Sequence, residues 1–367
     1  MENHSKEEPN KEQYALLVSC AIKEDFSAWN DYVSTLDEMI KLRGANFDEL
    51  TIKSARFKNK HGKGADLYGA TFKGSTLESI DLSDTHLMRA NFQDATIASC
   101  LFCEAACEEA VFENTTFFIV NFTHARCYNA NFRNAKFFSS SFYETQFASA
   151  NLEGARFITG KYNPLAAKKP RLNMCGANFR DTKLNSETYF DLCDVSRNTD
   201  FRSISFESAN FSAGLRQTLQ YCNRRHNWND WYKKQGALSS FLVKFFWMHS
   251  DYGRSAKRII SSFFMASLLF ATFYFFFPSL VQNLQHWQPI RSLYFSIVTM
   301  TTLGFGDMHA SPDSWIAPCI IMIQVLYGYV LLGGLITVLS NLFTSDGPAQ
   351  GLVKHPPVPL RVVFTME

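Results

Sequence analysis

Residues 130–139 read Ala-Asn-Phe-Arg-Asn-Ala-Lys-Phe-Phe-Ser, and the large apolar residue at 132 is followed five positions later by another at 137. The same step continues in both directions, so that 23 centres run from Phe47 to Phe157 and only Gly62 lacks a side chain for a core. A small residue stands two positions before most centres. Because a short repeat of fixed period is typical of a solenoid, the stretch predicts one built around the centre residues.

The repeats have a recurring form, seen in Ala65-Asp66-Leu67, Ala90-Asn91-Phe92 and Ala150-Asn151-Leu152. This pattern resembles the pentapeptide-repeat family. The resemblance implies a right-handed quadrilateral β-helix with four repeats per coil, in which the centre and the small residue both point inward. About six coils at the usual strand spacing of ~4.8 Å would make a rod of roughly 28 Å. Most of the 35 phenylalanines are then expected to form a ladder of buried rings.

The phase of the repeat also assigns the cysteines. Cys100 and Cys103 have the Cys-x-x-Cys spacing of a zinc or redox site, but Cys100 falls on an inward position and Cys103 on an outward one. Cys107 and Cys127 are separated by four pentapeptides, which is one coil, so we expect reduced thiols stacked in one inner column. Nine cysteines without paired spacing indicate a reducing compartment.

Breaks in the period predict the domain limits. We expect a disordered tail over 1–12, amphipathic capping helices over 13–43, and the solenoid over 44–214 with an insertion near 163–175. Residues 215–257 are predicted to hold a helix that caps the last coil and then a connector helix. The connector is expected to lie along the inner membrane face, with a buried cap of the soluble domain as the alternative.

Residues 258–343 have a different composition and predict an all-α, two-transmembrane channel domain. The runs 259–281 and 315–342 carry no charge, and each is long enough for a transmembrane helix. A basic group lies shortly before the first run, whereas Arg291 is the only Lys or Arg between the runs. The group consists of Lys233, Lys234, Lys244, Arg254, Lys257 and Arg258. The positive-inside rule then places both termini in the cytoplasm of a multi-pass cell-membrane protein. The polar, acidic start of the chain predicts no signal peptide.

Between the two runs, residues 294–307 read Tyr-Phe-Ser-Ile-Val-Thr-Met-Thr-Thr-Leu-Gly-Phe-Gly-Asp. This stretch resembles the pore helix and selectivity filter of potassium channels. The resemblance implies a pore helix over 290–301 and a filter over 302–307 whose backbone carbonyls replace the hydration shell of K⁺. Glycine is suited to such a backbone because it adopts positive φ without a Cβ clash. The implied ion-binding residues are Thr302, Leu303, Gly304, Phe305 and Gly306, with K⁺ at the first four.

Two departures from the commonest channel pattern concern the support of the filter. Phe305 replaces a tyrosine and lacks its hydroxyl, and Val298 stands where some relatives have glutamate, which leaves Asp307 without that partner. We expect Tyr294 to supply a substitute bond to Asp307. The predicted support set is Tyr294, Phe295, Val298, Thr301 and Asp307.

The second apolar run contains the gating candidates. Gly328, Gly333 and Gly334 interrupt a bulky helix, either as a hinge or to allow close helix packing. Leu339 and Phe343 are candidate hydrophobic constrictions. The sequence has no arginine-rich helix of the kind that senses voltage, so voltage gating is not expected. The cytoplasmic tail over 344–367 is too short for a nucleotide- or calcium-binding domain. Regulation is therefore expected from the N-terminal half.

These features predict a potassium-selective channel that is not an enzyme, because no catalytic constellation is present. Two spans cannot enclose a pore, so the family architecture implies a homotetramer in lipid, with potassium ions in the filter and no organic cofactor. A net charge of +2 and mixed surface charges argue against nucleic-acid binding. A cytoplasmic partner of the repeats is left open. The alternatives are a non-selective cation channel, or a membrane-tethered scaffold with a non-conducting pore.

Overall fold

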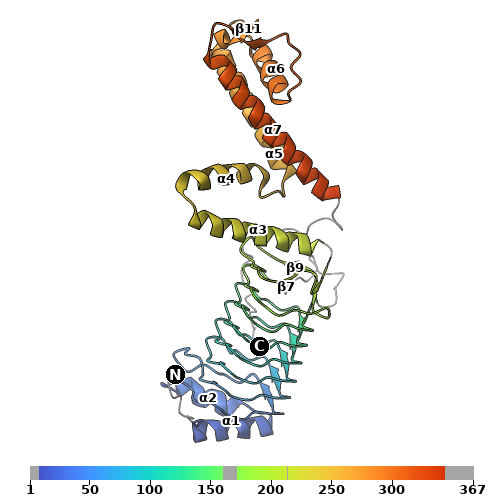
Figure 1. Cartoon of the computed structure of the whole chain (residues 1–367). Coiled ribbons are helices and arrows are strands. Elements are labelled where there is room, and N and C mark those ends of the chain that lie inside the picture. Colours follow the sequence, from blue (N-terminus) through green and yellow to red (C-terminus); the bar gives the residue numbers. More distant parts are fainter. Residues whose placement is uncertain (1–7, 160–171, 213, 344–367) are drawn as a thin grey trace, which may run out of the picture. The chain divides into compact units, whose positions relative to one another are not determined.

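The computed structural model describes residues 8–159, 172–212 and 214–343, which form two compact units that divide after His226. The first unit is a β-solenoid, as predicted, and the second is helical (Figure 1). The predicted tail over 344–367 lies outside the described residues, as do residues 1–7.

Parallel strands form one wall of the solenoid (Figure 1). From β2 to β6 each strand pairs with the strand four pentapeptides further on, as Thr76 does with Thr96, so four pentapeptides make one coil. A second small sheet pairs β7 (Leu172–Asn173) with β9 (Cys193–Asp194). The wall consists, in order, of β1 (Thr51–Lys53), β2 (Thr76–Glu78), β3 (Thr96–Ala98), β4 (Thr116–Phe118), β5 (Lys136–Phe138), β6 (Arg156–Ile158), β8 (Tyr189–Phe190) and β10 (Asn210–Phe211).

Each pentapeptide turns the chain through one corner. In the repeat centred on Phe92, the centre is fully buried and Asp94, two residues later, has a left-handed φ of 59°. The Asp94 N–H donates to the Glu113 carbonyl of the next coil at 2.9 Å. Left-handed φ recurs at this position along the solenoid, where Asp, Asn and Gly have the smallest steric cost.

The buried phenylalanines stack in columns, as predicted. The ring centroids of Phe72 and Phe92 are 4.7 Å apart, and those of Phe112 and Phe132 are again 4.7 Å apart. Such offset stacks add to the energy of burial. The column is continuous because centre residues twenty positions apart occupy equivalent places in successive coils.

The cysteines follow the same phase. Cys107 and Cys127 are fully buried and interact with each other, which confirms the shared inner column. Cys100 is buried and Cys103 is partly exposed. Burial raises the pKa of the Cys100 thiol to about 12, and burial also raises the pKa of Cys127 well above its ordinary value. These thiols therefore stay protonated and unreactive at neutral pH.

The first coil differs from the prediction at Gly62. Strand β1 pairs with β2 from Thr51 to Thr76, which is five pentapeptides further on instead of four, so one pentapeptide is extra. The backbones of Lys58 and Gly64 form an antiparallel β-bridge, and the residues between them loop out of the coil. In the turn of this loop, the Gly62 N–H donates to the Asn59 carbonyl at 2.9 Å. Gly62 is exposed with a φ of 74°, so it is a turn residue and not a core centre.

A later coil contains the predicted insertion near 163–175. Ser141 pairs with Asn173, whereas the regular step of four pentapeptides would pair it with position 161, so this coil is longer than the others. Residues 160–171 lie outside the described residues. Leu172, Met174 and Cys175 are buried, and Leu172 and Met174 belong to the core of the solenoid, so the described end of the predicted insertion is part of the solenoid.

Helices cover both ends of the solenoid. The helices α1 (Lys11–Lys23) and α2 (Ser27–Thr35) lie against the first coil, and the α1 helix begins before the predicted residue 13 because Asn10 accepts hydrogen bonds from the Glu12 and Gln13 N–H groups (Figure 1). The first parallel bridge of the solenoid pairs Lys41 with Asp66, so the solenoid begins before the predicted residue 44. At the other end, Leu219 in the first half of α3 (Leu215–Lys234) is buried in the core.

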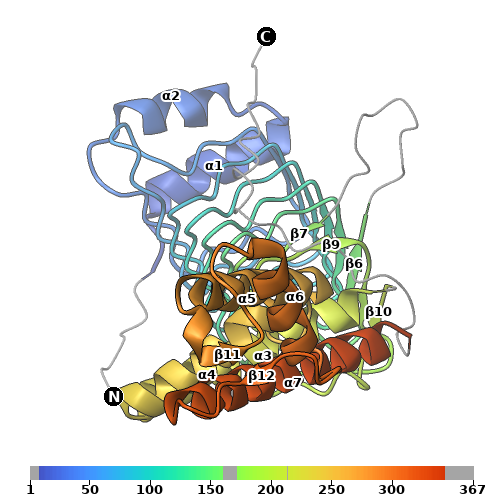
Figure 2. The same ribbon diagram turned by 90° about the horizontal axis from the view of Figure 1, so that it is seen from above.

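The second unit contains two long apolar helices, α5 (Ala256–Phe276) and α7 (Ile316–Phe343), with the short helix α6 (Pro289–Met300) beside α5 in both Figure 1 and Figure 2. By length and composition, α5 and Ile316–Ser340 can each cross a membrane.

The first span ends earlier than the predicted residue 281. Pro278 cannot donate a backbone hydrogen bond and starts a 3-10 turn, η1 (Pro278–Leu280). Strand β11 (Val281–Gln282) then pairs antiparallel with β12 (His309–Ala310). Before α5, the connector is α4 (Ala237–Ser250), and α4 contacts both α5 and α7.

Candidate functional site

The segment after α6 has an alternating backbone. Thr302, Gly304 and Gly306 have left-handed φ values of 59°, 44° and 80°, while Leu303 and Phe305 between them do not. Such alternation turns successive carbonyls toward the same side, as a row of cation-binding oxygens requires. The sequence indicated the two glycines but not Thr302, whose left-handed backbone costs about 1–2 kcal/mol in a residue with a Cβ.

The side chains of this segment are open within one chain. Leu303 is 63% exposed and Phe305 is 67% exposed. The Tyr294 ring of α6 stacks on the Phe305 ring, with centroids 6.4 Å apart, and the Asp307 carboxylate is close enough to interact electrostatically with the Tyr294 hydroxyl. The expected bond from Tyr294 to Asp307 stays a prediction.

Both ends of the segment are tied to its surroundings. At the start, the Leu303 N–H donates to the Val298 carbonyl at 3.1 Å, and the Thr301 hydroxyl donates to the Ile297 carbonyl at 2.9 Å. At the end, the Asn283 amide donates to the Asp307 carbonyl at 2.9 Å. Val298 itself is buried and apolar, so its contribution is through the backbone and packing.

A buried polar cluster, which the sequence reasoning missed, joins α6 to both long helices. The Tyr274 hydroxyl donates to Gln324 Oε1 at 2.7 Å, and Gln324 Nε2 donates to Ser296 O and Oγ at 3.0 and 2.9 Å. The Ser296 hydroxyl donates to the Ser267 carbonyl at 2.7 Å. One signal could have revealed it, because Gln324 is the first amide side chain in an otherwise apolar run. We call Tyr274, Gln324, Ser296 and Ser267 the Gln324 cluster.

The glycines of α7 have different surroundings. A Cβ on Gly328 would clash with the Met300 carbonyl oxygen, so the end of α6 packs directly on the α7 backbone. A Cβ on Gly334 would lie 3.8 Å from Ile259, and one on Gly333 would meet no described atom within 4 Å. Close packing therefore requires glycine at 328, whereas Gly333 is open within one chain. Phe295 is buried, and its ring centroid lies 5.0 Å from that of Tyr274.

The two constriction candidates lie near the end of α7. Leu339 is partly exposed, and the side chain of Phe343 lies outside the described side chains.

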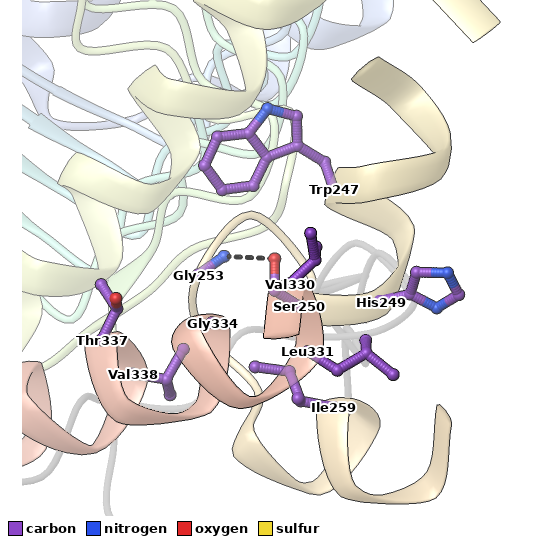
Figure 3. Close-up of a pocket in the computed structure, with 10 residues that line it drawn as sticks. All are labelled: Trp247, His249, Ser250, Gly253, Ile259, Val330, Leu331, Gly334, Thr337 and Val338. Atoms are coloured by element: carbon purple, nitrogen blue, oxygen red, sulfur yellow. Dashed lines mark hydrogen bonds between the residues drawn. The ribbon is translucent and has the colours of Figure 1, made fainter. Parts of the chain in front are cut away.

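The connector helix α4 meets α5 and α7 at His249. Ser262 and Tyr327 hydrogen-bond the two ring nitrogens of His249 at 3.0 and 2.9 Å. Beside this contact lies a mostly apolar cavity of about 110 Å³, around which Trp247, Ile259, Val330 and their neighbours are arranged (Figure 3). Burial lowers the pKa of His249, so the neutral ring is favoured at this junction.

Several apolar side chains of α4 are exposed within one chain, namely Leu238, Phe241, Phe245 and Met248. Phe245 also contacts the rings of His249 and Tyr327. The position of α4 at the membrane interface stays a prediction, which exposed apolar side chains would fit.

Two family models match different parts of the chain. One, described as an ion channel, matches residues 262–345. The other, described as pentapeptide repeats, matches eight copies within residues 65–102 and 120–157. Neither description is that of an enzyme family. No curated protein is significantly similar to the chain in sequence.

Solved structures similar to the chain are pentapeptide repeat proteins. HetL of the cyanobacterium Nostoc, which is involved in heterocyst differentiation regulation, is 17% identical over 46% of this chain and 70% of its own, with a TM-score of 0.32. A trypsin-treated form of QnrB1, a plasmid-mediated fluoroquinolone resistance protein, is 16% identical over 48% of this chain and 79% of its own, with a TM-score of 0.25.

Proposed function

Because this chain joins an ion-channel domain to pentapeptide repeats, we propose that it forms a homotetrameric channel selective for potassium in the cell membrane. The observation that carries this proposal is the alternation of φ at Thr302, Gly304 and Gly306 directly after α6. Carbonyls of residues 302–305 are the proposed ligands of K⁺, and the ion passes as cargo without any chemical change.

Exposed surfaces in the second unit support assembly of several copies. Within one chain, only 28% and 17% of the two candidate spans are buried, and the filter segment has an open side. Lipid can cover apolar helices, but it cannot satisfy a row of backbone carbonyls. Closed rotational symmetry around the filter would cover that side with identical copies.

The electrostatics of α6 suit a cation. A helix has a partial negative charge at its C-terminal end, which here is Met300, immediately before the filter segment. Four such ends directed at one axis would favour K⁺ in a central cavity, and filter carbonyls would then replace its water. Selectivity follows if the carbonyl ring matches the dehydration cost of K⁺ better than that of Na⁺.

The proposed orientation has both termini in the cytoplasm. Basic side chains before the first span support it through the positive-inside rule. They are Lys233, Lys234, Lys244, Arg254, Lys257 and Arg258. The solenoid is then a cytoplasmic domain with a structural or regulatory role and no catalytic one.

Ion flux into liposomes that contain the purified full-length protein tests the proposal. We expect K⁺ flux that exceeds Na⁺ flux and is blocked by barium. Gly306→Ala should abolish it, because a left-handed alanine costs about 1–2 kcal/mol in each copy, or about 4–8 kcal/mol in four. Leu303→Val, which keeps the backbone, is the matched control and should conduct.

The other outcomes each name a different protein. Equal K⁺ and Na⁺ flux that Gly306→Ala removes would indicate a non-selective cation channel. Absence of flux under every condition, in a correctly assembled protein, would favour a membrane-tethered scaffold whose repeats bind a partner.

A further inference from the structure

The Gln324 cluster is fully satisfied although it lies in apolar surroundings. Its four side chains are at most 1% exposed, and each hydroxyl or amide in it has a hydrogen-bond partner. A buried polar group without a partner is costly, so these donors and acceptors must keep their mutual positions. The members come from α5, α6 and α7, so the cluster fixes the register of three helices at one level.

The cluster acts on the last turn of α6. Gln324 holds both the carbonyl and the hydroxyl of Ser296, which lies one turn before Met300. The Ser267 hydroxyl lies 3.3 Å from Met300 Sδ, and one turn along α7 Gly328 lies against the Met300 carbonyl. Gln324 and Gly328, one turn apart on α7, therefore both contact the last turn of α6, which leads into Thr302.

Support on the other side of α6 is sparse. Val298 has no polar group, and Phe305 has no hydroxyl, so the side-chain contact seen on that side is the stacking of Tyr294 on Phe305. A filter whose carbonyls bind ions needs a rigid backbone, since a shift of a fraction of an ångström changes the size of the carbonyl ring. The rigidity of residues 302–306 must then come from the contacts of α6 with α5 and α7.

We infer that Gln324 is a positioning residue: through Ser296 it fixes the last turn of α6 and holds residues 302–306 in their K⁺-binding geometry. Tyr274 orients the Gln324 amide by donating to Oε1, which leaves Nε2 directed at Ser296. The inference rests on the proposed function, because it assumes that this segment binds K⁺.

The test compares the thermal stability of the purified assembly in K⁺ and in Na⁺. Ions that bind only the folded filter raise the melting temperature, so the difference between the two salts reports filter geometry. A merely structural loss lowers both melting temperatures equally. Gln324→Met, which keeps size without the amide, and Tyr274→Phe, which removes one hydroxyl, should each shrink the difference to less than about half of the wild-type value.

A matched control comes from the same helix as Tyr274. Thr272 is exposed, and its hydroxyl donates to the Leu268 carbonyl of its own helix at 2.8 Å. Thr272→Val should keep the full difference between K⁺ and Na⁺. In liposomes, Gln324→Met and Tyr274→Phe should also lower the ratio of K⁺ to Na⁺ flux, and the double variant should be no worse than Gln324→Met alone.

The outcomes separate the inference from the function on which it rests. A wild-type protein with neither K⁺-dependent stabilisation nor K⁺ flux would overturn the proposed function. A wild type with both, and variants that keep the difference as Thr272→Val does, would overturn the role of Gln324. If Gln324→Met does not assemble, Tyr274→Phe decides between the two results.

Discussion

The two units of this protein are organised in opposite ways. In the solenoid, phenylalanines such as Phe117 and Phe132 are fully buried, whereas few charged side chains are buried. In the helical unit, Phe264 and Leu268 are exposed, while Ser296 and Gln324 are buried. Water favours the first arrangement, whereas lipid favours the second because backbone and side-chain polar groups must then be satisfied internally. Apolar and polar residues are thus sorted in the two units by two different solvents.

The units also differ in how complete they are. The coils of the solenoid share one continuous core, and helices cover both ends within one chain. In the helical unit, residues 303–307 are exposed and only a minority of the residues of the two long helices are buried. A single chain is therefore enough to bury the core of the first unit, whereas the assembly proposed above would add neighbours to the second.

The largest expected effect tests the solenoid with two adjacent phenylalanines of β4. Phe117 is fully buried, and Phe118 is 42% exposed. Phe117→Ala should lower the free energy of unfolding by about 3–5 kcal/mol, whereas Phe118→Ala should cost under about 1 kcal/mol. Urea unfolding of the full chain in detergent, followed by circular dichroism, measures both. Equal losses would show that the inside and outside of this wall are wrongly assigned.

The next effect tests packing in the helical unit with two glycines of α7. Gly328→Ala would overpack the Met300 carbonyl and should cost about 1–3 kcal/mol, because backbone cannot move aside as a side chain can. Gly333→Ala, which meets no described atom within 4 Å, should cost little, because alanine has the higher helix propensity. Thermal unfolding in detergent and K⁺ flux are the measurements. A larger loss of flux at Gly333 than at Gly328 would favour the hinge interpretation instead.

A smaller effect concerns the corners of the solenoid. Ile119 is a β-branched residue with a left-handed φ of 55°, and its side chain is exposed. Ile119→Asn should raise the free energy of unfolding by about 1 kcal/mol, since asparagine tolerates this backbone better. Ser139→Asn, at the equivalent corner one coil later, is the control and should gain less, as serine is not β-branched. A loss at Ile119 would mean that its apolar contacts outweigh the backbone strain.

The smallest effect concerns the junction of α4 with the long helices. Since burial lowers the folded-state pKa of His249, its contribution to stability is complete above the ordinary histidine pKa of about 6.5 and is lost as pH falls below it. The protection factors of the α4 amides, which are corrected for the intrinsic effect of pH on amide exchange, should therefore fall on acidification through this range. His249→Phe should remove this pH dependence of the protection factors and serves as the control. Protection factors that are unaffected by pH in the wild type would contradict the prediction.

Much of the solenoid follows from the sequence, because the five-residue period places each residue without reference to distant ones. The pairing of Cys107 with Cys127 is an example. The five-residue period gave the wrong prediction at Gly62. A loop of one whole pentapeptide leaves the phase of the following repeats unchanged, so the period does not reveal it. The insertion was visible as a break in period, but the pairing of Leu172 with Cys193 inside its predicted range was not.

For the proposed filter, the sequence by itself determined the motif over 302–307, its place between two apolar runs, and the glycines at two of the three positions with left-handed φ. Tertiary structure alone decided which groups hold it. Tyr274 and Gln324 lie on different helices far apart in the chain, as do Ser296 and Gln324, so no local pattern pairs them. In a repeat, residues in contact are separated by a fixed number of positions, so the period predicts the contacts. In three packed helices, residues in contact have no regular separation in sequence, so only the tertiary structure shows which of them meet.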